Sequence, residues 1–418
     1  MKIAVIGNGG REHAIIKKIK ENKNVEKIYA IPGNGGISME AECINIGALE
    51  TEKIIDFVKE NSIDFVVVAQ DDPLVKGTVD ELEKIGVRSF GPNKSAAIIE
   101  GSKVFSKNLM KKYNIPTAKY EVFTNKEDAL NYIETAPIPT VIKADGLALG
   151  KGVIIANTKE EAKQAIIDMM ENKMFGESGS NIVIEEFLTG FEVTVLAFTD
   201  GKTIKPMISS SDHKRALDND EGLNTGGMGT IAPNPFYTED VAKRCMEEIF
   251  IPTINAMNSE NRTFKGCLYF GLMITENGPK VIEYNCRFGD PETQVVLPLL
   301  ETDFLDIMEA IYDEELDKID VKFKEKSAAC VIMASGGYPL KYEKGFEITI
   351  PENLDSEIYF AGTKLENGKL YTNGGRVLGI TSIGDNLKEA LEKSYESVKK
   401  INFKNAHYRT DIGKKFII

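Results

Sequence analysis

Short apolar runs alternate with helical patterns over the first hundred residues. Strand-like runs recur at 3–6, 27–31, 64–69 and 87–90. The segment 52–60 between two of these runs has a helical pattern. This alternation predicts a parallel, doubly wound sheet, in which ligands bind beyond the carboxyl ends of the strands. Three polar or glycine-rich loops stand at such ends, at 7–11, 32–36 and 70–74.

The next part of the chain predicts a small α+β lobe. A helical pattern covers 102–113, and strand patterns follow at 120–123, 139–144, 152–156 and 181–186. Before the last strand, Thr158 and Glu161 have the spacing of a capping box. The apolar residues behind them repeat at helical spacing, at Ala162, Ala165, Ile166, Met169 and Met170. The lobe would hold roughly 70 residues, enough for a compact unit.

The remaining pattern divides into two parts. Strands are predicted at 193–199, 265–275 and 280–284, and a helix at 239–258. From residue 327 onward the pattern changes to short strands and glycine-rich turns. A last amphipathic helix places Leu387, Ala390, Leu391, Tyr395 and Val398 on one face. The charged stretch 318–326 is the predicted boundary between the two parts.

Composition narrows the classes of protein. The chain has 418 residues, of which 42% are hydrophobic, so two to four folded domains are expected. Apolar runs stay well below the ~20 residues of a membrane span, and the N-terminus lacks a signal-peptide pattern, so we expect a cytoplasmic location. The net charge of −13 argues against a nucleic-acid-binding protein. Five scattered cysteines favour free thiols over disulfides or a zinc site.

The first glycine loop, Gly7-Asn8-Gly9-Gly10-Arg11, follows a strand and opens a helix, which is a favourable place for phosphate. It departs from the dinucleotide fingerprint because Glu12 stands at the third glycine position. The second strand also ends in Pro32-Gly33, where an acidic residue should bind the ribose. A nicotinamide cofactor is therefore disfavoured. A phosphate or sugar site and a plain strand–helix turn both remain open.

The second glycine loop runs from Lys143 to Val153. It is not a Walker A loop, because Gly146 and Gly150 are one residue too close together and Gly152 stands where Ser or Thr should bind magnesium. Its position between two strands suits a flap over a triphosphate, with Lys143 and Lys151 offsetting negative charge. A plain hairpin loop is the alternative.

Two further segments concern the nucleotide and its metal. The strand at 183–188, followed by Glu192, has the pattern of an adenine-binding hinge, although solvated glutamates at a strand end are the commoner case. In the segment 280–292, Glu283 and Asn285 lie two positions apart on one strand and share a face. Two oxygen ligands suit Mg²⁺ shared with phosphates.

Charged groups just beyond that strand suggest an amino-acid site. Arg287 can hold a carboxylate or phosphate bidentately, and Asp290 can receive an ammonium group. The polar cluster 212–215 and the possible amide nest at 225–229 fit the same cleft. His213 in that cluster is interpreted as a hydrogen-bonding residue rather than a proton carrier.

Taken in order, these segments resemble the glycinamide ribonucleotide synthetase family of the ATP-grasp superfamily, from Met1 to about Gly413. The matching strings are IGNGGREHA (6–14), PGN (32–34), PLVKG (73–77), FGP (90–92), EGSK (100–103), IPTA (115–118), VIKADGLALGKGV (141–153), DHKR (212–215), NTGGMG (224–229), EYNCRFGDPETQ (283–294) and TNGGRVL (372–378).

The resemblance implies an α/β multidomain fold. It implies an N-terminal Rossmann-like parallel sheet (1–102), a two-lobed ATP-grasp core and a C-terminal mixed α+β domain (323–418). The core would divide into a central domain (103–118 and 190–322) and a small lobe (119–189). The implied reaction is an ADP-forming carbon–nitrogen ligation of glycine to 5-phosphoribosylamine through glycyl phosphate, in purine synthesis. ATP and Mg²⁺ or Mn²⁺ are the implied cofactors.

The resemblance also implies residue roles. ATP is expected to contact the phosphate and flap residues Lys103, Lys143, Gly146, Gly150, Lys151 and Gly152, and the adenosine residues Glu185, Phe187, Leu188 and Glu192. The metal ligands are expected to be Glu283 and Asn285. Glycine and the acyl phosphate are expected at Asp212, Lys214, Thr225, Gly226, Gly227, Arg287 and Asp290, with Arg287, Asp290, Asp212 and Lys143 serving catalysis. Phosphoribosylamine is expected at Asn8, Gly9, Gly10, Gly33, Asn34, Lys76, Gly375 and Arg376.

The sequence departs from the family at Ala69-Gln70-Asp71-Asp72, where the family carries Gly-Pro-Glu, so Asp71 offers a carboxylate that is shorter by one methylene. Two other functions are considered: an ATP-grasp enzyme of purine synthesis acting on formate or bicarbonate, and a nucleotide-sensing protein without turnover. The NTGGMG and RFGDPETQ strings disfavour the first, and the intact Glu283, Asn285, Lys143 and Arg287 disfavour the second. We expect a monomer that binds small molecules, neither nucleic acid nor membrane, and receives phosphoribosylamine from the preceding amidophosphoribosyltransferase.

Overall fold

The N-terminal sheet is parallel, as the alternating pattern predicted. The computed structural model describes residues 1–147 and 152–417, and its first strands lie in the order β3-β2-β1-β4-β5. Their bounds are β1 Lys2–Gly7, β2 Lys27–Pro32, β3 Glu42–Cys43, β4 Phe65–Val68 and β5 Arg88–Phe90. Ile3 and Val5 pack in one apolar cluster, whereas Ala4 and Ile6 pack in another, so both faces of the sheet are covered.

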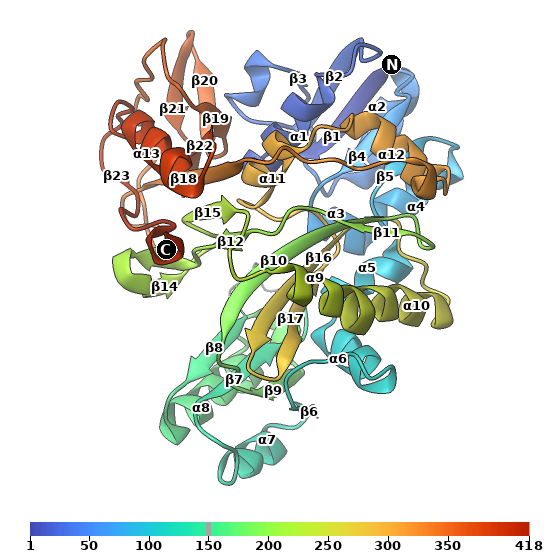
Figure 1. The fold of residues 1–418 in the computed structure, drawn as a ribbon, viewed down its shortest axis with the longest axis vertical. Coiled ribbons are helices and arrows are strands. Elements are labelled where there is room, and N and C mark those ends of the chain that lie inside the picture. Colours follow the sequence, from blue (N-terminus) through green and yellow to red (C-terminus); the bar gives the residue numbers. More distant parts are fainter. Residues whose placement is uncertain (148–151, 418) are drawn as a thin grey trace.

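Five helices accompany this sheet among the described residues. They are α1 Gly10–Ile19, α2 Thr51–Glu60, α3 Asp71–Lys76, α4 Thr78–Lys84 and α5 Lys94–Gly101. Helix α1 begins directly after β1, and α3 begins directly after the end of β4. The loops at these carboxyl ends therefore face the middle of the molecule, beside the orange and red C-terminal segments (Figure 1).

The small lobe forms a separate layer at the bottom of Figure 1. Its antiparallel sheet has the order β6-β9-β7-β8. The strands are β6 Tyr120–Phe123, β7 Thr140–Ala144, β8 Val153–Ala156 and β9 Ile182–Glu186, and the helices are α7 Lys126–Ile133 and α8 Lys159–Ile166. Thr158 caps α8 by accepting the Glu161 N–H, but Glu161 bonds to the amide of Asn157 rather than that of Thr158, so the predicted capping box is shifted by one residue.

The central sheet has the order β11-β10-β16-β17 and lies between the small lobe and the N-terminal sheet. Its strands are β10 Phe191–Thr199, β11 Ile204–Pro206, β16 Gly266–Thr275 and β17 Gly278–Asn285. Nearby helices are α6 Lys103–Lys112, α9 Glu239–Cys245, α10 Ile251–Ser259, α11 Thr293–Leu299 and α12 Phe304–Tyr312. The predicted helix 239–258 is interrupted by a wider turn at Met246–Phe250, just before Pro252 at the start of α10.

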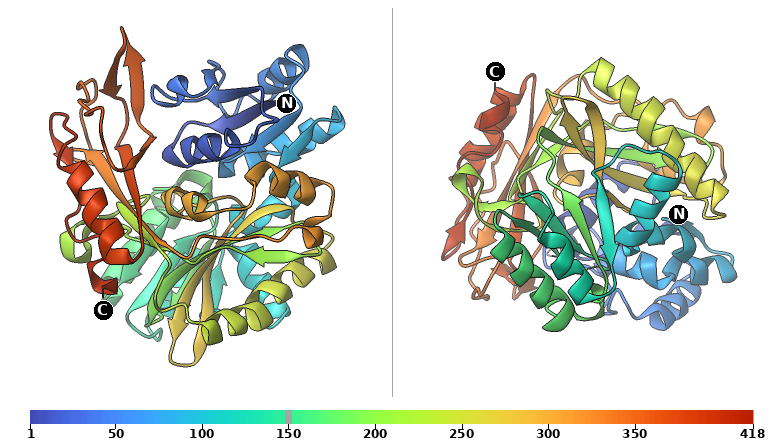
Figure 2. Two further views of the ribbon diagram at one scale, coloured as in Figure 1. Left: turned by 45° about the horizontal axis from the view of Figure 1, so that its top comes forward. Right: turned by 90° about the horizontal axis from the view of Figure 1, so that it is seen from below.

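The C-terminal sheet recruits strands from the central part of the chain. Its order is β12-β15-β18-β22-β19, and β23 also pairs with β18. The strands are β12 Ser211–Asp212, β15 Gly229–Ala232, β18 Ser327–Ser335, β19 Glu357–Phe360, β22 Arg376–Gly384 and β23 Ala406–His407. Helix α13 Leu387–Val398 covers one face of this sheet (Figure 2). Two separate hairpins pair β13 Arg215–Leu217 with β14 Glu221–Asn224, and β20 Thr363–Glu366 with β21 Lys369–Thr372. No helix within 1–147 or 152–417 is long and apolar enough to cross a membrane.

Candidate active site

Strand β17 carries the two predicted metal ligands at its carboxyl end. In its antiparallel pairing with β16, Glu283 lies opposite Gly271 and Asn285 lies opposite Tyr269, so the two side chains share one face. Burial alone would raise the pKa of Glu283, but the positive charges of Lys214, Lys143 and Lys103 outweigh burial and lower it. Glu283 is therefore an ionised carboxylate at neutral pH.

These residues fit a divalent cation that shares its coordination with phosphates. Glu283 and Asn285 supply hard oxygen ligands from one strand. Among the described residues, no cluster of three or more His, Cys, Asp or Glu side chains is suited to hold a metal ion. A cation at Glu283 would complete its shell with phosphate oxygens and water, which is how Mg²⁺ is usually held in nucleotide sites.

Two buried lysines share one carboxylate beside this strand. Glu185 on β9 lies 3.1 Å from the Lys143 ammonium through Oε1 and 3.1 Å from the Lys107 ammonium through Oε2. Lys143 also donates to the carbonyl of Ile282, which places it next to Glu283. Burial lowers the pKa of Lys107 to about 8. The negative charge of Glu185 opposes this shift, and the positive charge of Lys143 adds to it. Glu185 thus sits behind the lysines rather than on an open surface.

The base of the predicted flap is tied to the start of α6. The Asp145 carboxylate accepts hydrogen bonds from the Ser102 hydroxyl (2.8 Å) and the Val104 amide (2.9 Å). Lys103 donates to the Gly146 carbonyl at 3.3 Å. A Cβ at Gly146 would lie 2.5 Å from the Ser178 hydroxyl, which explains the glycine. Gly150 and Lys151 lie outside the described residues, and the Gly152 carbonyl accepts from Ala144.

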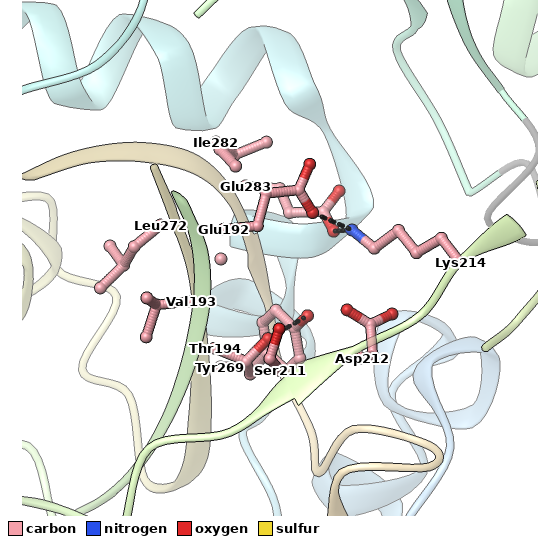
Figure 3. A pocket seen from close by; sticks show the side chains of 11 residues that line it. Glu192, Val193, Thr194, Ser211, Asp212, Lys214, Tyr269, Leu272, Ile282 and Glu283 are labelled. Atoms are coloured by element: carbon pink, nitrogen blue, oxygen red, sulfur yellow. Dashed lines mark hydrogen bonds and ion pairs between the residues drawn. The ribbon is translucent and has the colours of Figure 1, made fainter. Parts of the chain in front are cut away.

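The expected adenosine residues lie on both sides of the turn between β9 and β10. Phe187 and Leu188 follow the end of β9 and join the two lobes, with Phe187 exposed. Glu192 lies near the start of β10, and its carboxylate is 4.0 Å from the Lys214 ammonium. Glu192 is thus linked to Glu283, because Lys214 also lies 3.7 Å from the Glu283 carboxylate. Figure 3 shows the Lys214 ammonium pointing toward both glutamates, to which dashed lines join it.

Asp212 on β12 faces the same lysine (Figure 3). Burial raises the pKa of Asp212 to about 7, and the charge of Lys214 opposes that rise while Glu292 adds to it. The space enclosed by this group is only about 10 Å³, so the side chains nearly fill it. The neighbouring His213 accepts from the Gly413 amide (3.1 Å) and lies 3.3 Å from the Gly229 carbonyl. Burial, with Lys415 and Arg409, lowers the His213 pKa to about 4, so this residue is a neutral hydrogen-bonding group.

Arg287 is held between two carboxylates from the N-terminal part of the chain. Its Nη2 lies 2.9 Å from Glu100 at the end of α5 and 3.5 Å from Asp71 at the start of α3. Burial would raise the pKa of Asp71, but the charges of Arg287 and Arg11 lower it. The departure at Asp71 therefore lies against Arg287, and the shorter carboxylate still reaches the guanidinium.

Asp290 belongs to a second bridge, formed with Arg376. The two side chains are 3.1 Å apart, and Arg376 also donates to the carbonyls of Gly226 (2.8 Å) and Asp290 (2.9 Å). The Gly226 amide donates to the Tyr338 hydroxyl, and a Cβ at Gly227 would lie 2.5 Å from Pro291. Arg376 therefore fixes the 225–229 loop against the loop after β17. Thr225 completes the turn by bonding to the Lys214 carbonyl.

A larger cleft lies between the N-terminal sheet and the C-terminal segments. Its volume is about 570 Å³. Six of the residues predicted for phosphoribosylamine or glycine line it, namely Asn8, Gly9, Gly33, Asn34, Asp290 and Arg376. The lining also includes Tyr338, Thr363, Lys364 and Asn373. This size accommodates a sugar phosphate, since small-ligand pockets are typically about 300–1,000 Å³.

Three other residues predicted for phosphoribosylamine, Gly10, Gly375 and Lys76, do not line this cleft. Gly10 packs against Gln294, and Gly375 packs against Tyr338. The Lys76 ammonium donates to the Leu49 carbonyl and is not part of the lining. The Gly9 amide donates to Glu12 at 2.6 Å, so a carboxylate of the protein itself compensates the start of α1. This contact explains why the loop carries Glu12 where the dinucleotide fingerprint has its third glycine.

Sequence reasoning assigned no role to several residues of this site. Glu100, Lys107, Asp145 and Tyr338 contact predicted site residues, yet their partners are distant in the sequence. The EGSK string drew attention to Lys103, although its first residue, Glu100, makes the more extensive contacts. Periodicity carries no signal for such long-range pairs.

Three family models match successive parts of the chain. They are the phosphoribosylglycinamide synthetase N domain (residues 1–100), its ATP-grasp (A) domain (101–293) and its C domain (328–415). The phosphoribosylamine–glycine ligases of Caldanaerobacter subterraneus subsp. tengcongensis and Clostridium acetobutylicum are each 48% identical to this chain, over 99% of it and over 99% and 100% of their own lengths.

Solved structures show the same fold. The phosphoribosylamine–glycine ligase of Thermotoga maritima is 35% identical, with a TM-score of 0.88, and the alignment covers 98% of this chain and 100% of that one. Biotin carboxylase of Campylobacter jejuni, solved as a β,γ-ATP complex, has a TM-score of 0.75 at 12% identity, over 97% of this chain and 92% of that one. At that identity the likeness concerns the fold alone.

Proposed function

The chain belongs to the phosphoribosylglycinamide synthetase family, and from that premise we propose that it ligates glycine to 5-phosphoribosylamine. ATP is consumed, and glycinamide ribonucleotide, ADP and phosphate are the products of this step of purine synthesis. The observation that carries the proposal is the convergence of Glu283, Asn285 and the buried lysines at one edge of the central sheet, next to Arg287. We further propose a cytoplasmic monomer that uses Mg²⁺ or Mn²⁺.

The ATP phosphates lie among Lys103, Lys143 and the flap, in this proposal, with adenosine at the turn after β9. Glu283 and Asn285 would hold a divalent cation, which would supply charge neutralisation for the phosphates and for the transferring group. Lys143 points to the same place because Glu185 and the Ile282 carbonyl fix its ammonium. Such preorganised positive charge lowers the cost of bringing a carboxylate to a triphosphate.

Glycine lies between Asp212 and Arg287. Asp212 receives the ammonium group, and Arg287 holds the carboxylate oxygens. One carboxylate oxygen attacks the γ-phosphorus and the bond to ADP breaks, giving glycyl phosphate. The amine of phosphoribosylamine, bound in the 570 Å³ cleft, then attacks the acyl carbon. Phosphate leaves with the acyl C–O bond electrons, and the nitrogen loses a proton.

The requirement for both substrates tests the function directly. Release of inorganic phosphate is expected only when ATP, glycine and phosphoribosylamine are all present. Formate in place of glycine should give no release above the background of ATP hydrolysis. Release that depends on formate or bicarbonate would identify a different ligase, and no substrate-dependent release would favour a nucleotide sensor. A handover of phosphoribosylamine from the preceding amidotransferase would appear as a higher flux when both enzymes are mixed.

Binding of glycine is expected to depend on pH through Asp212. Its pKa is raised to about 7, so the carboxylate that receives the ammonium is progressively protonated below that pH. The value of kcat/KM for glycine should therefore fall as pH decreases through about 7, approaching tenfold per pH unit. The measurement is kcat/KM between pH 5.5 and 8.5 at saturating ATP and metal.

The control for this pH profile is Asp212→Asn. This variant should have a lower kcat/KM for glycine at pH 8 and should lose the dependence near pH 7. A flat profile in the unchanged protein, or the same slope in Asp212→Asn, would assign the titration to another group.

A further inference from the structure

Glu100 is a buried carboxylate beside the metal site, with 7% of its surface exposed. It lies in the last turn of α5 and reaches beneath the end of β17. Its Oε2 accepts the Cys286 amide at 2.7 Å, and its Oε1 lies 2.9 Å from Arg287 Nη2. Neither of these contacts involves the substrates, so the proposed reaction gives this carboxylate no direct role.

The third partner of Glu100 is the side-chain amide of Asn285. One terminal atom of this amide lies 3.0 Å from Glu100 Oε1 and 3.1 Å from the Tyr284 carbonyl oxygen. Both neighbours are hydrogen-bond acceptors, so this terminal atom must be the nitrogen. The amide oxygen of Asn285 therefore points the other way, and its orientation is decided by Glu100 and one backbone carbonyl.

We propose that Glu100 is a positioning residue that turns the Asn285 amide so that its oxygen, and not its nitrogen, faces the divalent cation. The inference rests on the proposed function, because it takes Asn285 as a metal ligand. Partners of metal ligands commonly fix ligand orientation, and their loss typically weakens metal binding about 10–100-fold. The same carboxylate holds Arg287, so one buried group aligns the metal ligand and the residue for the glycine carboxylate.

The donor pattern predicts what Glu100→Gln would do. The Cys286 amide needs an acceptor, so the Gln oxygen takes the place of Oε2. The Gln NH₂ then occupies the place of Oε1, where it faces the Asn285 NH₂ and Arg287, which are both donors. Asn285 relieves this mismatch by rotating half a turn, which presents its NH₂ group to the cation. A donor cannot ligate a metal ion.

Asp71 supplies a matched control. Asp71→Asn removes the same single negative charge beside Arg287, at a carboxylate 3.5 Å from the guanidinium. No contact between Asp71 and Asn285 is among the hydrogen bonds of the described chain. A general loss of negative charge near Arg287 would affect both variants, whereas a turned Asn285 amide would affect only Glu100→Gln.

The experiment measures binding of Mn²⁺ to the full chain in the presence of ADP, from the electron paramagnetic resonance signal of free Mn²⁺. The Mn²⁺ dissociation constant is expected to rise about 10–100-fold in Glu100→Gln and to stay within about threefold in Asp71→Asn. Equal weakening in the two variants, or unchanged binding in Glu100→Gln, would overturn the inference. Failure of the unchanged protein to bind Mn²⁺ with ADP would instead overturn the proposed metal site.

A second substitution tests the orientation itself. In Glu100→Gln/Asn285→Asp, one Asp oxygen accepts from the Gln NH₂ and the other stays free for the metal. Binding of Mn²⁺ by this double variant is expected to recover to within about fivefold of the unchanged protein, since the Gln NH₂ again faces an acceptor and a carboxylate presents only oxygen atoms to the cation, while Arg287 keeps Asp71 as a carboxylate partner. If Glu100→Gln alone does not fold, the double variant is still expected to fold and bind. A double variant that folds without binding Mn²⁺, or that does not fold, contradicts the inference.

Discussion

Glu283→Gln is expected to lower kcat about 10²–10³-fold at millimolar Mg²⁺, the loss typical of removing one preorganised charge-stabilising group. Glutamine keeps the size of the side chain but removes the charge that three lysines hold in the ionised form. A cation bound there would lose its charged ligand on β17, while Lys214 loses a partner at 3.7 Å. The measurement is phosphate release over a series of Mg²⁺ and Mn²⁺ concentrations.

Glu186→Gln provides the matched control for this substitution. Glu186 ends β9 and pairs with Lys280 at 3.2 Å on a partly exposed surface. Its loss should change kcat by less than about twofold, because exposed ion pairs contribute only about 0–1 kcal/mol. Part of the activity of Glu283→Gln should return at high Mn²⁺. Near-normal turnover of Glu283→Gln at ordinary Mg²⁺ would refute Glu283 as a metal ligand.

Lys143→Met is expected to lower kcat by a similar factor of about 10²–10³, whereas Lys107→Met should leave kcat within about tenfold. The two lysines contact the same Glu185 carboxylate at the same distance of 3.1 Å. Only Lys143 also bonds to the Ile282 carbonyl, next to Glu283, and lowers the pKa of Glu283. Position relative to the phosphates, rather than pairing with Glu185, distinguishes the two residues.

Both variants should lose stability, because each leaves Glu185 with one lysine instead of two. Removing one partner of a buried pair typically costs about 3–5 kcal/mol, and the remaining lysine should reduce that cost. Thermal unfolding and kcat measured on the same preparations separate the two effects. Equal losses of kcat in the two variants would mean that turnover depends on the charge balance around Glu185. Such a result would contradict a specific role of Lys143 at the phosphates.

Local patterns in the sequence predicted those parts of the site that depend on neighbours along the chain. Glu283 and Asn285 share a face because strand periodicity places alternate side chains together. The N-terminal parallel sheet followed from the alternation of strands and helices. The prediction of the parallel N-terminal sheet therefore rested on signals that are only a few residues long, whereas the confirmed multidomain fold class with its two-lobed ATP-grasp core followed from the family resemblance.

The sequence could not indicate contacts between distant segments. Glu100 reaches Asn285 and Arg287 only because α5 packs beneath β17. No strand was predicted around Asp212 or Gly229, yet both segments form short strands by pairing toward β18. Strands of two and four residues have too few positions to show alternation. Glu12 was recognised as a departure from a fingerprint, but its role as a helix cap required the structure.

The pairing of β15 with β18 also limits how the chain can be divided. Gly229 lies opposite Val331 and Ala232 lies opposite Ala328, so a single sheet crosses the charged stretch between the two regions. A protein cut before Ser327 would leave the β15 edge without its hydrogen-bonding neighbour, and bare edges invite self-association. Asp212 would lose the support of that sheet at the same time. The gene segments for these regions are therefore poor candidates for separate expression or for exchange between relatives.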